Sequence, residues 1–394
     1  MNPQESCLQV SVTFTMNTVK VHSQLRGSLD TKLIEGNMAT DFNVQNAFNI
    51  TDRRRFLKNI SVVSAAFATT DLWTMSAAGQ ENMSFVNSGA VPRRAFGRTG
   101  VQVSILGIGG YTIGEAKTEA EGIRIIHKAM DAGINFMDNS WEYHDGRSEE
   151  WMGKALKGRR DKAFLMSKVC THGRDAKVAM RQLEESLRRL QTDHLDLWQV
   201  HEVIYDNDPD LHFAKGGVME AIAQAKQQGK VRFVGFTGHK DPAIHLKMLA
   251  YDFPFDACQL PLGPFDATFR SFEQKVLPEL NRRGIAPIGM KSLGGTAESV
   301  KKGVLTAKEA LTYVMSLPIA ILVSGMDSLE VLNENLEIAR SFTPMKPEAM
   351  QALRDRCAIH AADGRFELYK TSKRFDGPPG REQHGFPSAK EMES

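Results

Sequence analysis

The chain has 394 residues, of which 42% are hydrophobic and 24% charged, and its formal net charge is +2. These proportions are ordinary for a globular protein, and the length allows two average domains or one large barrel with extensions. The small net charge, without a Lys/Arg stripe interleaved with aromatic residues, argues against a nucleic-acid-binding protein. Four widely separated cysteines without C-x-x-C spacing argue against a zinc or iron–sulfur site and against a disulfide framework, and no metal site is predicted.

The N-terminal 80 residues do not have the pattern of a folded domain. Residues 1–50 are polar and rich in Asn and Thr, which predicts a disordered leader. Within residues 51–80, the run RRRFLK at 53–58 precedes a short apolar stretch and resembles a twin-arginine export signal. We therefore expect export to the periplasm by the twin-arginine machinery. The alternative is a basic turn before a helix in a cytoplasmic protein.

The sequence leaves alternatives for the start and the cleavage site of this signal segment. The start of the protein could be Met38, and small residues at 66–68 or 76–78 could carry a cleavage site. The apolar stretch is far shorter than the ~20 residues needed to span a bilayer, so we expect no stable membrane anchor.

From residue 93 onward, short apolar runs alternate with amphipathic helical patterns. Residues 94–104 have the pattern of a hairpin. Eight strands are then predicted at 105–109, 135–138, 163–169, 195–201, 231–237, 257–262, 286–291 and 319–325. Near-continuous apolar runs are typical of parallel strands buried on both faces. Eight strand–helix units over about 250 residues predict an α/β fold, a (β/α)₈ TIM barrel, at residues 93–342 with an N-terminal β-hairpin. Residues 343–394 are predicted to form a C-terminal helix and an extended tail.

A glycine cluster after the first strand offers a competing interpretation. Gly107, Gly109 and Gly110 resemble part of a dinucleotide-binding fingerprint. The third glycine of that fingerprint is out of register, however, and a glycine cluster alone is weak support for a Rossmann fold.

Four side chains that could carry chemistry fall at or after the ends of successive predicted strands. They are Asp138, Tyr143, Lys168 and His201. The ends of parallel barrel strands share one rim, so these groups are expected to meet in one pocket. An acid, a phenol, an amine and an imidazole together can transfer protons during carbonyl reduction.

In combination, these motifs resemble the aldo-keto reductase family. The resemblance covers residues 93–340 and rests on FGRTGVQVSILGIGG, DNSWEYHDGRSEEWMGKAL, LMSKV, DLWQVH, GKVRFVGFTG and SLEVLNENLEIA. It implies a barrel that binds NADP or NAD without a Rossmann domain, and a catalytic tetrad of Asp138, Tyr143, Lys168 and His201. Glu142, which neighbours this tetrad, has no role in the resemblance, and Glu202 could contact the substrate or cap a strand.

The four residue types suit the roles that the family assigns them. The Lys168 ammonium would stabilise the phenolate of Tyr143 and lower the pKa of the phenol from about 10. Asp138 would hold that ammonium, Tyr143 would donate a proton to the carbonyl oxygen, and His201 would orient the same oxygen.

The resemblance also implies a set of cofactor-binding residues, some of which depart from the family pattern. Gln259 matches the family glutamine that holds the nicotinamide carboxamide, whereas the Ser-Asn pair is replaced by Thr237 and Gly238, followed by His239. Met290 stands where an aromatic residue usually stacks on the nicotinamide. The pyrophosphate is expected at Lys291, Ser292 and Gly294, and the adenosine end at Ser324, Gly325, Asp327 and Asn335. Because the usual Lys and Arg for a 2′-phosphate are missing, the choice between NADP and NAD stays open.

We therefore expect a nicotinamide-dependent oxidoreductase that acts on a small carbonyl compound or alcohol. Two alternatives remain at this stage. One is a cofactor-binding regulatory or scaffolding subunit with little turnover, and the other is a barrel isomerase or lyase without a cofactor.

Overall fold

The computed structural model describes residues 9–15, 18–24, 90–170, 175–377, 388 and 391. The chain divides into two units, residues 1–80 and 81–394. In the first unit, strands β1 (Gln9–Thr15) and β2 (Thr18–Gln24) form an antiparallel hairpin. Apolar and polar residues alternate in β1, which is typical of a strand. Both strands lie within residues 1–50, for which the sequence predicted a disordered leader without strands. The twin-arginine-like segment at 51–80 lies outside the described residues.

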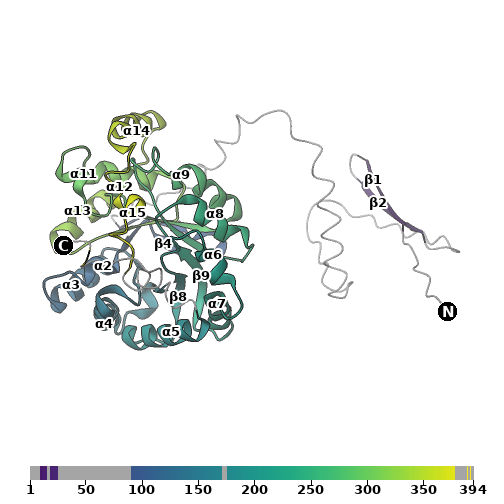
Figure 1. Ribbon diagram of the computed structural model, residues 1–394, viewed down its shortest axis with the longest axis horizontal. Helices are drawn as coiled ribbons and strands as arrows, with labels where there is room; N and C mark the ends of the chain where they lie inside the picture. The colour runs from purple at the N-terminus through teal and green to yellow at the C-terminus, as the bar shows by residue number, and fades with distance from the viewer. Residues whose placement is uncertain are drawn as a thin grey trace. The chain divides into compact units, whose positions relative to one another are not determined.

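The second unit is built around a closed barrel of eight parallel strands (Figure 1). This arrangement confirms the predicted (β/α)₈ fold. The strands run around the barrel in chain order: β5 (Leu106–Ile108), β6 (Phe136–Met137), β7 (Phe164–Val169), β8 (Leu195–Val200), β9 (Val231–Thr237), β10 (Ala257–Pro261), β11 (Ala286–Met290) and β12 (Ile321–Ser324). Most of their residues are buried, since side chains inside the barrel and under the helices are both shielded from water.

Helices follow each strand and cover the outside of the barrel. The eight main ones are α3 (Glu119–Asp131), α4 (Arg147–Leu156), α5 (Ala176–Leu190), α7 (Val218–Gln227), α8 (Pro242–Ala250), α10 (Leu277–Arg283), α12 (Ala307–Ser316) and α13 (Leu329–Arg340). Shorter helices are η1 (Gly97–Thr99), α2 (Gly110–Ile113), η2 (Tyr143–Gly146), η3 (Arg160–Lys162), α6 (Asp208–Phe213), α9 (Phe272–Lys275) and α11 (Glu298–Lys301). Several begin at side-chain caps, such as Thr118, Asp175 and Ser328, which accept hydrogen bonds from the first turn.

The predicted hairpin closes one end of the barrel. It consists of β3 (Arg93–Ala95) and β4 (Gln102–Ser104). Phe96 between them is fully buried, and its ring lies 4.8 Å from that of Phe164 and 6.1 Å from that of Phe136. Both partners stand at the start of their strands, so the hairpin seals the N-terminal end of the barrel. The carboxyl ends of the strands form the opposite rim.

The C-terminal residues pack over that opposite rim. Helix α14 (Pro347–Ala361) is followed by the short α15 (Leu368–Thr371), drawn in yellow in Figure 1. We call residues 364–377 the closing segment. Lys370 forms a buried ion pair with Asp266 after β10, at 2.6 Å, and Asp376 pairs with Lys240 after β9, also at 2.6 Å. The extended arm predicted from composition thus contains one short helix, and these two ion pairs help to hold it on the barrel.

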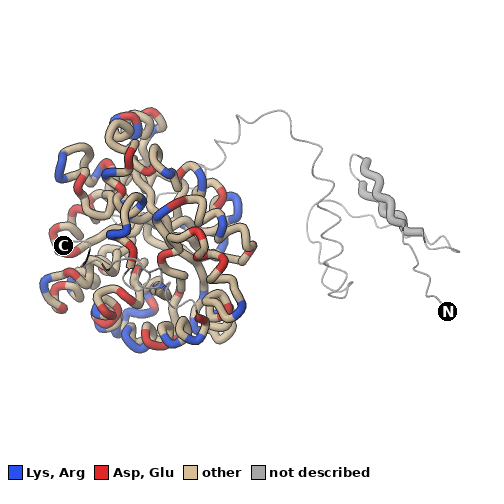
Figure 2. The backbone as a smooth tube through the Cα atoms, viewed as in Figure 1, with Lys and Arg blue, Asp and Glu red and all other residues tan. Residues whose placement is uncertain are grey.

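Charged residues of both signs are interspersed along the outer helices, as Figure 2 shows. Among the described residues, no helix combines the length and apolarity that a membrane span requires.

Candidate active site

Three of the four predicted catalytic residues are joined by one ammonium group. Lys168 Nζ, in β7, lies 2.6 Å from Asp138 Oδ1 after β6 and donates hydrogen bonds to Asn139 O at 2.7 Å and to the Tyr143 hydroxyl at 3.2 Å. Lys168 is 1% exposed and Asp138 3%. A lysine buried in this way needs anionic and carbonyl partners, and the end of β6 supplies them. The structure therefore brings the acid, the amine and the phenol into direct contact.

His201 follows β8 and faces the same group. Its ring centroid lies 5.7 Å from that of Tyr143 in an edge-on arrangement. Its Nδ1 lies 2.5 Å from Glu142 Oε1 and 3.1 Å from Ser140 Oγ. Sequence reasoning missed this role of Glu142. Its position directly before Tyr143 was the only signal in the sequence.

The turn that carries Tyr143 is held in an unusual backbone conformation. His144 and Asp145 have φ of 51° and 55°, in the left-handed region that non-glycine residues seldom adopt. His144 Nε2 lies 2.8 Å from Tyr111 O. The Tyr111 ring packs edge-on against Tyr143 at 5.4 Å. These contacts fix the direction of the phenol.

The acidity of Tyr143 differs from the sequence-based expectation. Burial raises its pKa well above 10, and the negative charges of Asp138, Glu142 and Glu202 add to this effect. This direction is opposite to the lowering expected from Lys168, because burial and the nearby carboxylates disfavour the phenolate. Tyr143 is a protonated phenol at neutral pH.

The residues predicted to hold the nicotinamide lie next to this group. Gln259 in β10 donates from Nε2 to Asp138 Oδ1 at 3.4 Å, whereas its buried Oε1 has no hydrogen-bond partner in the described part of the chain. Thr237 pairs with Gln259 across β9 and β10, and Met290 ends β11. An unpartnered buried oxygen next to the acid–amine pair suits the amide of a nicotinamide carboxamide, so these residues fit the cofactor.

His239, which follows the Thr237-Gly238 pair, is also buried. It is 3% exposed, and its Nδ1 lies 3.2 Å from Tyr369 O in the closing segment. Burial lowers its pKa.

The predicted pyrophosphate residues form a turn under the closing segment. Lys291 and Gly294 have φ of 57° and 74°. Lys291 Nζ lies over the rings of Tyr369 at 5.7 Å and Phe375 at 5.6 Å. Burial lowers the pKa of Lys291, and the charge of Lys168 lowers it further. Ser292 is buried beside this turn.

The predicted adenosine residues lie at the end of β12. Asn335 in α13 donates from Nδ2 to Ser324 Oγ and to Gly325 O, both at 3.3 Å. Asp327 is exposed. The structure thus gathers the predicted cofactor residues at the carboxyl ends of β9 to β12, on the same rim as Lys168.

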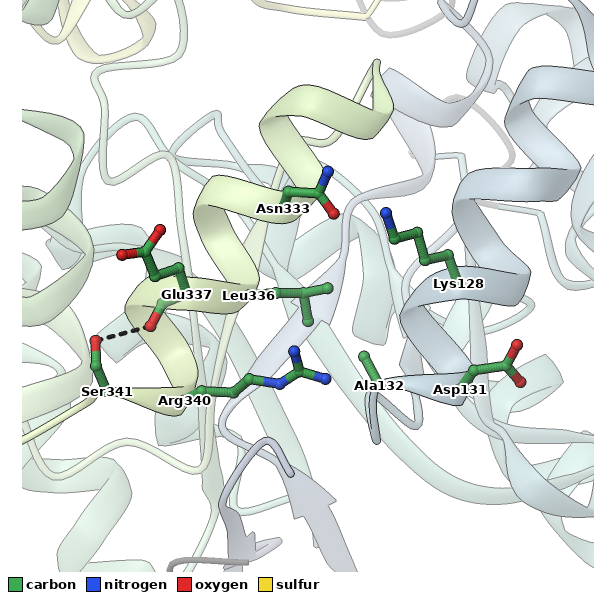
Figure 3. A pocket seen from close by; sticks show the side chains of 8 residues that line it. All are labelled: Lys128, Asp131, Ala132, Asn333, Leu336, Glu337, Arg340 and Ser341. Carbon is green, nitrogen blue, oxygen red and sulfur yellow. Dashed lines mark hydrogen bonds between the residues drawn. The ribbon is translucent and has the colours of Figure 1, made fainter. Parts of the chain in front are cut away.

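Two open clefts lie away from the predicted catalytic and cofactor-binding residues. One, of about 690 Å³, lies between α3 and α13 and is lined by Lys128, Asp131, Ala132, Asn333, Leu336, Glu337, Arg340 and Ser341 (Figure 3). Asp131 and Arg340 end their helices, so this cleft belongs to the hairpin end of the barrel. The second, of about 680 Å³, is lined by Arg93, Asn135 and Phe164 among others, at the same end. Neither contains a predicted site residue.

Comparison with known proteins agrees with the geometry of the site. The sequence model of the "Aldo/keto reductase family" matches residues 105–303. Aldo-keto reductase YhdN of Bacillus subtilis is 30% identical over 231 residues, which are 55% of this chain and 64% of YhdN. L-galactose dehydrogenase of Arabidopsis thaliana is 31% identical over 157 residues, 37% of this chain and 48% of that protein.

Among solved structures, aldo-keto reductase AKR11C1 from Bacillus halodurans is similar with a TM-score of 0.58 and 23% identity. The alignment covers 67% of this chain and 95% of that one. At this identity, the likeness supports the fold only.

Proposed function

We infer that this chain, which belongs to the aldo/keto reductase family, is a nicotinamide-dependent oxidoreductase that reduces aldehydes or ketones to alcohols, or runs the reverse reaction. One observation carries the proposal. A buried ammonium, Lys168 Nζ, links a carboxylate at 2.6 Å and a phenol at 3.2 Å at the carboxyl ends of the barrel strands. Perturbed ionisable groups that converge at a barrel rim are typical of active sites.

The roles of the four side chains follow from their contacts. When bound, the nicotinamide supplies or accepts the hydride. Tyr143 keeps its proton at neutral pH and donates it to the carbonyl oxygen of the substrate. The Lys168 ammonium stabilises the phenolate that this transfer leaves, and Asp138 holds the ammonium in place. His201, oriented by Glu142, donates a hydrogen bond to the same substrate oxygen.

The cofactor would be held along one side of the rim. Thr237 and Gln259 would bind the carboxamide and Met290 would pack against the ring, since these residues end adjacent strands. Lys291, Ser292 and Gly294 would hold the pyrophosphate. Ser324, Gly325 and Asn335 would hold the adenosine end, with Asp327 near the ribose. Either NADP or NAD is compatible with these residues.

Export by the twin-arginine machinery is a separate proposal, supported by the RRRFLK motif alone. That machinery transports folded proteins, so cofactor bound in the cytoplasm would travel with the enzyme to the periplasm. The closing segment supports such retention, because it packs against Lys291 and His239.

The test is a turnover assay with a mutational control. Purified protein is mixed with NADPH or NADH and a panel of aldehydes, and nicotinamide absorbance is followed. Turnover that Tyr143→Phe abolishes supports the enzyme. Bound cofactor without turnover would instead favour the regulatory alternative.

A further inference from the structure

We propose that Glu142, His201 and Glu202 form a binding site for a divalent cation of the zinc class, beside the proton-transfer residues. In the described part of the chain, these three side chains offer ligand atoms that all lie within 4.8 Å of one another. Glu142 Oε1 and His201 Nδ1 are already 2.5 Å apart. Three protein ligands with a further position open is the usual composition of a non-structural zinc site.

Burial makes a cation favourable at this place. The side chains of Glu142 and Glu202 are each 12% exposed. Two carboxylates so close together and so little hydrated repel one another unless positive charge lies between them. Two ammonium groups lie nearby: Lys168 is engaged with Asp138, and Lys291 interacts electrostatically with Glu202 without forming an ion pair with it among the described residues. Glu202 Oε2 accepts a hydrogen bond from Gly377 N at 2.7 Å, which offsets only part of its charge.

A second, independent observation comes from His239. Its Nδ1 lies 3.2 Å from Tyr369 O, and since a carbonyl oxygen can only accept, Nδ1 carries the proton. Nε2 is buried, has no hydrogen-bond partner within normal distance among the described residues, and lies 3.8 Å from Glu202 Oε1. A cation between this nitrogen and the carboxylate would bind both, so His239 is the side chain best placed to complete the site.

The donor set selects the kind of cation. Imidazole nitrogens with carboxylate oxygens suit zinc and related transition ions, whereas magnesium and calcium prefer oxygen ligands alone. Cys170 Sγ, 2.9 Å from Glu142 Oε2, adds a soft neighbour. The Nδ1 contact of His239 with a backbone carbonyl is also the arrangement that orients metal-binding histidines.

The position of this site predicts its effect on the enzyme. A cation bound to the His201 side chain would prevent that side chain from donating its proposed hydrogen bond to the substrate oxygen. We therefore expect zinc to inhibit the reductase. Binding itself is independent of turnover, so it can be measured whether or not the proposed function is correct.

The test is a direct binding measurement on full-length, tag-free protein that has been treated with a chelator. Titration calorimetry with ZnCl₂ should show one saturable site for the wild type. Glu142→Gln with Glu202→Gln should weaken binding at least about 100-fold, and His239→Gln about 10-fold or more. The matched control is Asp145→Asn, which removes an exposed carboxylate from the same turn and should bind like the wild type.

Thermal unfolding keeps the result interpretable if a variant is less stable. Zinc should raise the Tm of the wild type and of Asp145→Asn but leave the double variant unchanged, because only a folded state that holds the ion is stabilised. The proposal is overturned if the wild type shows no saturable binding, or if the folded double variant binds zinc as tightly as the wild type.

Discussion

Lys370 and Asp266 form an ion pair in which both side chains are 0% exposed, with 2.6 Å between Nζ and Oδ1. Lys370 also lies 2.9 Å from Glu367 and donates to Phe269 O at 2.7 Å. The pair ties the closing segment to the loop after β10. Because these charges cannot be rehydrated without moving that segment, the pair couples closure of the rim to the stability of the fold.

Replacing Lys370 by Met should destabilise the protein strongly. Loss of one partner leaves Asp266 buried without its cation, and breaking a buried pair costs about 3–5 kcal/mol. Denaturant unfolding followed by circular dichroism measures the change. Lys154→Met is the control, since its pair with Glu119 is 45% and 43% exposed and should contribute at most about 1 kcal/mol. Equal effects of the two variants would contradict this account.

Stability should also depend on pH through Glu367. Burial raises its pKa from 4.5 to about 7, so between these values the folded protein holds a proton that the unfolded chain has lost. This contribution to the unfolding free energy is complete below pH 4.5 and is lost as the pH rises through 7. Glu367→Gln keeps the uncharged form at every pH. This substitution should flatten the fall in unfolding free energy between pH 5 and pH 8, measured by denaturant titration. Parallel curves of unfolding free energy against pH for the wild type and the variant would exclude Glu367 as the source of the fall.

The barrel could be predicted from the sequence because its signals are local. Each strand, such as the one that contains Lys168, is a short and mostly apolar run, and this pattern indicates a strand that is buried on both faces. The parallel topology then places all carboxyl ends on one rim. The meeting of Asp138, Tyr143 and Lys168 follows from that topology together with the family resemblance.

The remaining features depend on contacts between distant parts of the chain. The bond between His239 and Tyr369 joins positions 130 residues apart, and no local pattern indicates it. The raised pKa of Tyr143 likewise depends on burial and on nearby carboxylates, which surround the phenol only in the folded barrel. The role of Glu142 could not be read from the sequence, because a glutamate in a rim turn is usually a solvated residue.

Tyr143→Phe should abolish most of the reductase activity while the protein stays folded. Loss of a general acid typically lowers rates by about 10²–10⁴-fold. Because burial raises the pKa of Tyr143 well above 10, the wild-type reduction rate should stay flat across neutral pH, whereas alcohol oxidation should rise towards alkaline pH. Steady-state rates in both directions provide the measurement. Tyr111→Phe, a neighbouring ring that is 51% exposed, serves as control and should have a far smaller effect.

Glu142→Gln should impair the orientation of His201 rather than proton transfer by Tyr143. Loss of the carboxylate at 2.5 Å from Nδ1 removes a charge-assisted contact, which corresponds to about a tenfold fall in kcat/KM. Asp145→Asn should leave kcat/KM as in the wild type. An unchanged kcat/KM in Glu142→Gln would show that this carboxylate does not act through His201.

The closing segment should control how fast the cofactor leaves. Asp376 pairs with Lys240 at 2.6 Å and accepts a hydrogen bond from the Tyr205 hydroxyl at 2.7 Å, so it holds the end of the segment beside the predicted pyrophosphate turn. Asp376→Asn weakens both contacts and should speed nicotinamide release about tenfold. The release rate is measured by stopped-flow fluorescence of the bound reduced nicotinamide, after loaded enzyme is mixed with an excess of a second protein that binds the released cofactor. Asp363→Asn is the matched control, because its partner Arg365 is an exposed residue of the same segment. If both variants release cofactor at the wild-type rate, the segment packs on the rim without gating it, and retention during export would need another cause.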